Sequence, residues 1–274
     1  MIQVKKSTGE NQEFSEEKLI TSLRYTGATE DQIQDICKSI KSQIHDGIPT
    51  RVIYNLAFRR LRQISRPLSA YYGTKRALLE LGPDGFIFEK YLAKILENIG
   101  FKAVTNIVVP GKCVNHEVDV IAENLEERIL IECKFHRSHE RSNDLKIALY
   151  IKARALDIFD GPDKALYDDF WLVSNTSFSE DAIRYSTCAG LRLWGANFPP
   201  QNTLQDVIRE NGLDPVTCLS SLKKGEKKML IESDILMAKE VKKNPNVLKD
   251  IGLETTRIKR VLNEIENVTQ GSLK

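Results

Sequence analysis

Val118-Asp119-Val120, followed by Ile129-Leu130-Ile131-Glu132-Cys133-Lys134, is the stretch of sequence that decides the fold. Both runs are rich in β-branched and aliphatic residues, and the polar residues 123–128 join them. This pattern predicts a hairpin of two mostly buried strands. Side chains alternate along a strand, so Glu132 and Lys134 should share one face. If Ile121 pairs with Leu130, Asp119 lies opposite Glu132 and all three charged groups converge on one patch.

A charged patch among apolar neighbours needs a physical reason, because burying a charge is costly unless it is paired or binds a metal. The carboxylates of Asp119 and Glu132 repel each other unless a cation lies between them. A hard divalent ion such as Mg²⁺ or Mn²⁺ prefers oxygen ligands of this kind. Lys134 would then contact a metal-bound water or a phosphate oxygen. A buried salt bridge between Lys134 and one carboxylate explains the same pattern without catalysis.

Helices and strands are predicted to alternate around this hairpin. Upstream, apolar residues at helical spacing between Phe88 and Ile99 predict an amphipathic helix. Glu89 sits at the edge of its apolar stripe, where it can reach a site at the helix–sheet boundary. Downstream, the sequence predicts a helix over 144–159, a strand over 170–174, a helix over 180–189 and a strand over 191–194. The 180–189 helix has Ser179 as its N-cap and Gly190 as its stop signal.

This order of elements, with these residues, resembles the PD-(D/E)XK nuclease superfamily and, within it, the Mrr-type restriction endonucleases. The matching pieces are Gly85-Phe86-Ile87-Phe88-Glu89, His116-Glu117-Val118-Asp119-Val120, Ile131-Glu132-Cys133-Lys134, residues 174–179 and residues 191–195. The resemblance covers residues 82–200 and implies a restriction-endonuclease-like α/β fold with metal-dependent cleavage of DNA. Val118 stands where the name of the motif has proline.

The same resemblance implies roles for individual residues. Asp119 and Glu132 would be the metal ligands, Lys134 the catalytic lysine and Glu89 the additional acidic residue on the first helix. We expect the backbone carbonyl of Cys133 to complete the oxygen ligands of one Mg²⁺ ion. Glu89 would bind a second ion or its waters.

The first 81 residues predict a separate, mostly helical domain. Residues 2–6 and 11–14 flank a turn and predict a small β-hairpin. Ser15 is the expected N-cap of a first helix, and Thr29 with Gln32 predicts a capping box for a second. Two more helices are expected, one after Thr50 that ends at Pro67 and one over about 69–81. Residues 51–79 contain seven Lys or Arg and no Asp or Glu, which indicates either a solvated face or a polyanion site.

This segment resembles the ATP-cone, a small nucleotide-sensing domain. The resemblance rests on residues 4–9, Phe14 to Leu19, Gly47-Ile48-Pro49-Thr50 and residues 70–78. It implies ATP as a regulatory ligand, with Lys5, Lys6 and Lys18 at its phosphates and Thr50 near the nucleotide. The chain contains no GxxxxGK[ST] and no GxGxxG motif. Nucleotide binding therefore rests on this resemblance and on the basic residues.

The net charge of +2 implies no overall attraction to DNA, so any contact must come from a local patch. One candidate patch begins at the catalytic strand and passes through His136, Arg137, His139 and Arg141 to Lys146, Lys152 and Arg154. Its cationic side chains would hold backbone phosphates without selecting bases. A solvated loop and helix face is the alternative.

The remaining features place the protein in a compartment and suggest partners. The five cysteines are scattered, odd in number and without a CxxC, which excludes a zinc ribbon and favours a reducing cytoplasm. No apolar run reaches the ~18 residues of a membrane span, and no signal peptide is expected. A helix over about 255–268 carries a narrow apolar stripe that needs a partner surface, so we expect an interaction role and consider a homo-oligomer.

The sequence therefore predicts an α/β protein in three parts. These are a mostly helical ATP-cone over residues 1–81, a restriction-endonuclease-like sheet domain over 82–200 and a helical extension over 201–274. The expected function is a Mg²⁺-dependent DNA endonuclease regulated by ATP. A non-catalytic, ATP-sensing regulator that binds DNA with a nuclease-like fold is the alternative. A role in nucleotide metabolism is a third possibility, but it leaves the clustered acids unexplained.

Overall fold

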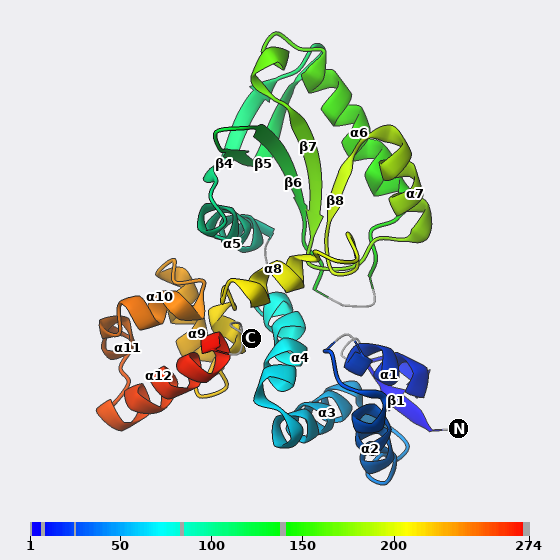
Figure 1. Ribbon diagram of the computed structural model, residues 1–274, viewed down its shortest axis with the longest axis vertical. Coiled ribbons are helices and arrows are strands. Elements are labelled where there is room, and N and C mark those ends of the chain that lie inside the picture. The colour runs from blue at the N-terminus through cyan, green and yellow to red at the C-terminus, as the bar shows by residue number, and fades with distance from the viewer. Residues whose placement is uncertain (1, 7–8, 25, 83–84, 138–140, 271–274) are drawn as a thin grey trace.

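The computed structural model of the chain describes residues 2–6, 9–24, 26–82, 85–137 and 141–270. A sheet domain, an N-terminal group of helices and strands, and a C-terminal group of helices surround the central helices α4 and α8 (Figure 1). Four groups of residues used in the sequence predictions lie outside the described residues. They are Ser7 and Thr8 of the hairpin turn, residues 83 and 84 at the start of the predicted sheet domain, His139 of the basic patch, and residues 271–274 at the end of the predicted extension.

The N-terminal region contains the predicted hairpin, with β1 (Gln3–Lys5) antiparallel to β2 (Asn11–Glu13). A third strand, β3 (Ile48–Pro49), runs parallel to β1. The helices are α1 (Glu16–Arg24), α2 (Glu30–Lys41), α3 (Thr50–Ile64) and α4 (Arg66–Leu79). The Ser15 side chain accepts a hydrogen bond from the Lys18 N–H at 3.3 Å, and Thr29 forms its capping box with Gln32. These predicted helix starts are confirmed.

Pro67 does not mark the end of a helix, as the sequence had suggested, but lies in the first turn of α4. The first turn suits proline because its missing N–H would have no intrahelical acceptor there. The helix before it already ends at Ile64, and Ser65 is the cap that separates the two helices.

The sheet domain is built on five strands in the order β4-β5-β6-β7-β8. The strands are β4 (Lys102–Pro110), β5 (Asn115–Glu123), β6 (Arg128–Lys134), β7 (Asp169–Ser174) and β8 (Arg192–Trp194). The β4-β5-β6 part is antiparallel, whereas β6, β7 and β8 are parallel. Ile121 pairs with Leu130, which confirms the predicted hairpin register.

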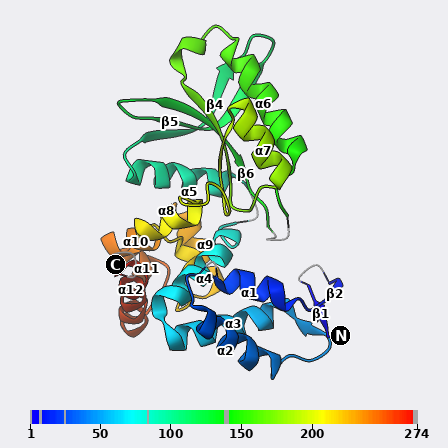
Figure 2. The same ribbon diagram turned by 45° about the vertical axis from the view of Figure 1, so that its right-hand side comes forward.

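Helices cover both faces of this sheet (Figures 1 and 2). Helix α5 (Gly85–Asn98) packs on one face, against a core that includes Val120 and Ile131. Helices α6 (Leu145–Phe159) and α7 (Glu180–Ala189) pack on the other, against Ile121 and Leu130. The Ser179 cap and the left-handed Gly190 bound α7 as predicted. A 3₁₀ turn, Lys164–Leu166, precedes β7.

The C-terminal region is mainly helical, as the sequence predicts. Helix α8 (Leu204–Glu210) lies against the sheet domain, because Leu204, Ile208 and Leu213 belong to the core beneath α5. The remaining elements are a 3₁₀ turn (Val216–Cys218), α9 (Lys224–Glu232), α10 (Ala238–Lys243), α11 (Asn246–Asp250) and α12 (Thr255–Gln270).

The apolar stripe of α12 finds its partner surface within the chain. Ile258, Val261 and Ile265 are buried in a core with residues such as Leu219 and Leu248. The stripe is therefore no reason to expect a second protein on this surface. Among the described residues, no helix combines the length and the apolar character needed to cross a membrane.

Candidate active site and a cavity between two domains

The predicted acidic pair lies where β5 and β6 pair. The ladder of paired residues ends at Val120 with Ile131, so Asp119 and Glu132 are the next residues of the two strands beyond the last pair. The Asp119 Oδ2 atom accepts a hydrogen bond of 2.7 Å from the Cys133 N–H. This contact fixes the Asp119 carboxylate to the strand that carries Glu132 and Lys134. The prediction that these three residues come together on paired strands agrees with this arrangement.

Glu132 is 6% exposed, and its charge is balanced by a residue that the sequence had assigned to the DNA-binding patch. Arg154 on α6 places Nη1 at 2.5 Å from Glu132 Oε2, and its Nη2 donates to the Glu117 carbonyl. Lys134 Nζ lies farther from Glu132, at 4.0 Å from Oε1, and the lysine side chain remains partly exposed. The buried salt bridge considered from the sequence therefore exists, but Arg154 makes it more closely than Lys134. The Lys134 ammonium is left near the surface, where a substrate can reach it.

Glu89 approaches the pair from α5. A left-handed residue in β4, Asn106 with φ 58°, interrupts pairing opposite Asp119, since Thr105 pairs with Val120 and Ile107 with Val118. The Asn106 side chain lies close enough to Glu89 to lower the pKa of that carboxyl, against the larger effect of burial. Non-glycine residues in this left-handed conformation are uncommon and cluster at active sites. The sequence carried no pattern that singled out Asn106.

Burial and mutual repulsion dominate the electrostatics of the acidic cluster. Burial raises the pKa of Glu132 to about 7, the Asp119 charge adds to the increase, and Arg154 and Lys134 act in the opposite direction. Burial, then the charges of Asp119 and Glu132, likewise raise the pKa of Glu89 to about 7. The pKa of Asp119 is raised by burial, against the Cys133 hydrogen bond. The ionised cluster is thus costly without an added cation.

The donor set is compatible with a hard divalent ion. The described residues contain no group of three or more His, Cys, Asp or Glu side chains placed to hold a metal. Mg²⁺, however, is commonly bound through one or two carboxylates and fills its other positions with water or substrate phosphates. Asp119 and Glu132 supply two carboxylates whose repulsion such an ion would relieve. Only oxygen ligands are required, so the buried Cys133 thiol would take no part.

The predicted DNA-contacting residues lie at the end of β6 and along α6. Arg137, Arg141 and Lys146 are exposed, and Lys146 shares one side of α6 with Arg154, eight residues later. Lys152 is half-buried and lies on the opposite flank, because it is only two residues from Arg154. The exposed cations of the predicted patch therefore lie in the first turn of α6 and in the segment between β6 and α6.

His116, three residues before Asp119, has a structural partner outside the acidic cluster. Its Nε2 lies 2.8 Å from Asp157 Oδ2, and the N–H groups of Cys113 and Val114 donate to the same carboxylate. The His116 hydrogen bond is the main reason that the pKa of Asp157 falls to about 2. This group ties the β4–β5 turn to α6, in agreement with a histidine that has no catalytic task.

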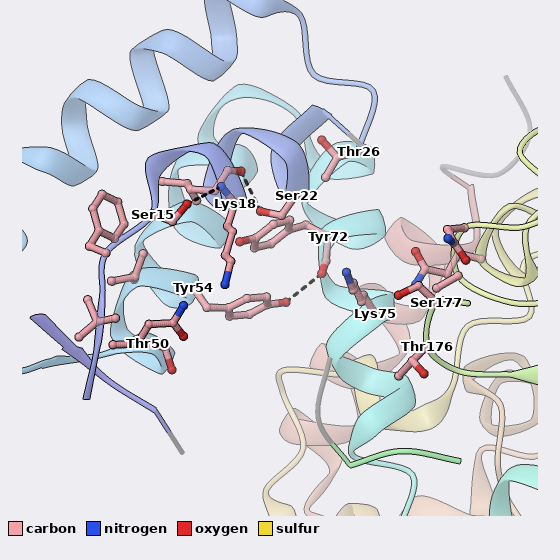
Figure 3. Close-up of a pocket in the computed structure, with 18 of the residues that line it drawn as sticks. Ser15, Lys18, Ser22, Thr26, Thr50, Tyr54, Tyr72, Lys75, Thr176 and Ser177 are labelled. Atoms are coloured by element: carbon pink, nitrogen blue, oxygen red, sulfur yellow. Dashed lines mark hydrogen bonds between the residues drawn. The ribbon is translucent and has the colours of Figure 1, made fainter. Parts of the chain in front are cut away.

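A cavity of about 500 Å³ opens between the N-terminal region and the sheet domain (Figure 3). Lys18 and Thr50, two of the residues expected at a nucleotide, line it. Lys5 and Lys6 do not line it: Lys5 is exposed, and the Lys6 ammonium lies 3.8 Å from Glu10. Lys75 on α4 also lines the cavity. It lies in the 70–78 stretch of the ATP-cone resemblance, but the sequence analysis gave it no role in binding. Tyr54 and Tyr72, whose rings stack with centroids 4.7 Å apart, form part of its wall.

Two family matches divide the chain. Residues 82–197 match the restriction endonuclease family, and residues 215–269 match the family described as AF1548-like, C-terminal. The first match supports the nuclease part of the sequence prediction, whereas the second replaces the unspecified extension with a domain type that the sequence reasoning missed. Neither match includes residues 1–81, so the ATP-cone stays a prediction, as do the exact domain boundaries.

Individual relatives agree with this division. An uncharacterised protein from Archaeoglobus fulgidus is 34% identical over 178 residues, which are 65% of this chain and 99% of that protein. The crystal structure of a protein of unknown function, AF1548, has a TM-score of 0.56 at 33% identity and covers 69% of this chain and all of its own. Can2 from Sulfobacillus thermosulfidooxidans, solved with cyclic tetra-adenylate, has a TM-score of 0.34 at 19% identity over 45% of this chain and 36% of Can2. A TM-score and a sequence identity as low as these support no conclusion about this protein.

The identity and coverage of the archaeal relative, together with the two family matches, place the chain in a family. It belongs to the family of the uncharacterised Archaeoglobus fulgidus protein, with a restriction endonuclease domain at residues 82–197 and an AF1548-like C-terminal domain at residues 215–269.

Proposed function

We propose that this protein is a Mg²⁺-dependent DNA endonuclease whose activity responds to ATP. The observation that carries this proposal is the convergence of Asp119, Glu132 and Lys134 on paired strands within a restriction endonuclease domain. A purely structural cluster has no need of a repelling acid pair beside a lysine that stays partly exposed. Phosphodiester hydrolysis uses both, because it needs a cation at the phosphate and a group that positions the attacking water.

Each residue has a distinct part in the proposed reaction. Asp119, Glu132 and the carbonyl of Cys133 would hold the metal, which when bound stabilises the charge that grows on the phosphate and activates water. Lys134 orients the attacking water or contacts a phosphate oxygen. Arg154 keeps the Glu132 carboxylate in place through its 2.5 Å contact. Glu89, with a pKa near 7, can hold or release a proton at neutral pH.

The DNA backbone would lie along the basic edge of α6. Arg137, Arg141 and Lys146 are exposed beside the end of β6, which carries Lys134. Contacts of this kind position a duplex through its phosphates and give no base selectivity. Lys152 belongs to the same proposed patch but would reach the backbone only on the far flank of α6.

The ATP-responsive part of the proposal is supported by the cavity that contains Lys18 and Thr50. Its volume of about 500 Å³ is within the ordinary range of small-ligand sites. The cavity combines a cation for phosphate with aromatic and polar side chains for the rest of a nucleotide. Lys5 and Lys6 would contribute only long-range attraction, because neither lines the cavity.

One observation favours a second candidate function. Arg154 already neutralises Glu132 in the way that a bound cation would. A nuclease-like fold with this ion pair could bind DNA and ATP as a regulator without cleaving the DNA. The two functions differ in a single outcome, namely whether phosphodiester bonds are broken.

Supercoiled plasmid DNA incubated with the purified protein tests the proposal. Four conditions are needed: with Mg²⁺ or with EDTA, each with and without ATP. We expect nicked or linear DNA only with Mg²⁺, and a rate that changes when ATP is added. DNA that is bound but remains intact in all four conditions would favour the regulator. Cleavage that is insensitive to ATP would remove only the regulatory half.

A further inference from the structure

The cavity described above has two walls that come from different domains (Figure 3). Lys18, Tyr54 and Lys75 belong to the N-terminal region. Thr176 and Ser177 belong to the loop after β7, and Gln205 lies in the first turn of α8. The N-terminal domain by itself would therefore provide only half of the enclosure.

Two nitrogen donors at this cavity lack a partner among the described residues. Gln205 is only 6% exposed, and its Nε2 is buried without a hydrogen-bond acceptor. A donor left in this state costs about 1–3 kcal/mol, so natural proteins usually pair it or use it. Lys75 has no acidic partner in the described chain, and burial lowers its pKa. Both groups would gain from an anionic, acceptor-rich ligand.

We propose that ATP in this cavity is held by both domains at once. Its phosphates lie between Lys18 and Lys75, and the amide of Gln205 turns into the cavity to donate a hydrogen bond to the same nucleotide. This inference rests on the proposed ATP response but goes beyond it, because it makes the sheet domain part of the binding site. ATP then favours the arrangement in which the two domains are docked, since only that arrangement offers every contact.

A short hydrogen-bonded path leads from the cavity to the catalytic strand. The Thr176 N–H donates to Ser174 Oγ at 3.2 Å, and Ser174 Oγ donates to the Lys134 carbonyl at 2.7 Å. The fully buried Asn143 donates from Nδ2 to Ser174 Oγ at 2.9 Å and to the Ser177 carbonyl at 3.2 Å. A ligand that presses on the 176–177 loop thus acts on the backbone of Lys134 through two bonds. This gives the bound nucleotide a physical route to the site of cleavage.

Calorimetric titration of the full-length protein with ATP tests the two-domain site. The test variant is Gln205→Met, which keeps the length of the side chain and removes the amide. Gln201→Met is the matched control, because Gln201 is exposed and does not line the cavity. Lys75→Met tests the second unpaired donor independently. Thermal unfolding without ATP reports whether each variant is folded.

We expect about tenfold weaker ATP binding for both Gln205→Met and Lys75→Met, and unchanged binding for Gln201→Met. The midpoint of unfolding without ATP should not fall in Gln205→Met, because the substitution removes an unpaired buried donor. A structural role for Gln205 would lower that midpoint. Wild-type affinity in a folded Gln205→Met protein would overturn the two-domain site and leave ATP binding by the N-terminal domain intact. Absence of ATP binding by the wild-type protein would instead overturn the proposed ATP response itself.

Discussion

Replacing Glu132 with glutamine should make the metal-free protein more stable while it removes activity. Burial and the Asp119 charge raise the pKa of Glu132 from 4.5 to about 7. The folded state therefore binds more protons than the unfolded state between these two pH values. The contribution of Glu132 to the free energy of unfolding is fully present below pH 4.5 and is lost as the pH rises through 7. Above pH 7, ionised Glu132 costs the fold about 3 kcal/mol relative to a neutral side chain.

Glutamine keeps the shape of Glu132 and an oxygen that accepts from Arg154, but it carries no charge. In EDTA at pH 8, Glu132→Gln should raise the free energy of unfolding by up to about 3 kcal/mol. The gain should shrink to nearly zero at pH 4.5, where wild-type Glu132 is neutral in the folded protein. Mg²⁺ should reverse the order of stability at pH 8, because the ion stabilises only the protein that retains both carboxylates.

Urea unfolding at several pH values, with EDTA or Mg²⁺, measures this difference. Glu126→Gln is the matched control: it removes one negative charge from the turn of the same hairpin, where the residue is exposed. Its stability should follow that of the wild type at every pH. A Glu132→Gln protein that is less stable than the wild type at pH 8 in EDTA would refute the claim that burial and the Asp119 charge make ionised Glu132 unfavourable in the metal-free fold.

Three other substitutions probe separate parts of the structure. Arg154→Met should destabilise the metal-free protein by about 3–5 kcal/mol in urea unfolding at pH 8, because it leaves the buried Glu132 carboxylate without its partner. Mg²⁺ should restore part of the loss by neutralising the same carboxylate. An equal loss with and without the ion would argue against a shared site. Asp214→Asn should stabilise the protein by up to about 3 kcal/mol at pH 8 and by almost nothing at pH 4. The reason is that burial raises the pKa of Asp214 to about 6, although Thr74 donates a hydrogen bond of 2.7 Å to its carboxylate. A gain in stability that is independent of pH would contradict this explanation. Lys18→Ala should weaken ATP binding about tenfold in calorimetry, whereas Lys5→Ala should bind nearly as the wild type does, since of these two lysines only Lys18 lines the cavity. An equal loss of affinity in both variants would favour the family resemblance, which places both lysines at the phosphates, over the structure.

Features set by local chemistry were predictable from the sequence. The alternation of apolar and charged residues around Asp119 and Glu132 specified the hairpin register, because a slip by one residue would have moved an entire buried face into solvent. The boundaries of α7 followed from Ser179 and Gly190, which act within one turn of the helix. The candidate acids and Lys134 were found for the same reason, as they stand out against a buried strand.

Features set by contacts between distant segments were not predictable. The sequence pattern indicates that Arg154 is a surface cation on an amphipathic helix. Only the packing of α6 on the sheet brings its side chain to Glu132. Asn106 adopts a left-handed conformation inside a strand whose sequence shows no interruption. Gln205 lies more than a hundred residues from the other wall of the cavity. The α12 stripe suggested an external partner because its internal partner surface is assembled from several short helices.

Plasmid cleavage by Asp119→Ala and Lys134→Ala, with Mg²⁺ present, tests the nuclease assignment most directly. Both variants should fold, since neither change opens the apolar core, and circular dichroism and thermal unfolding confirm this. Lys102→Ala, at an exposed position at the start of β4, is the matched control and should cleave as the wild type does. We predict that cleavage is lost in Asp119→Ala and in Lys134→Ala. Wild-type cleavage by either folded variant would contradict the catalytic assignment of these strands.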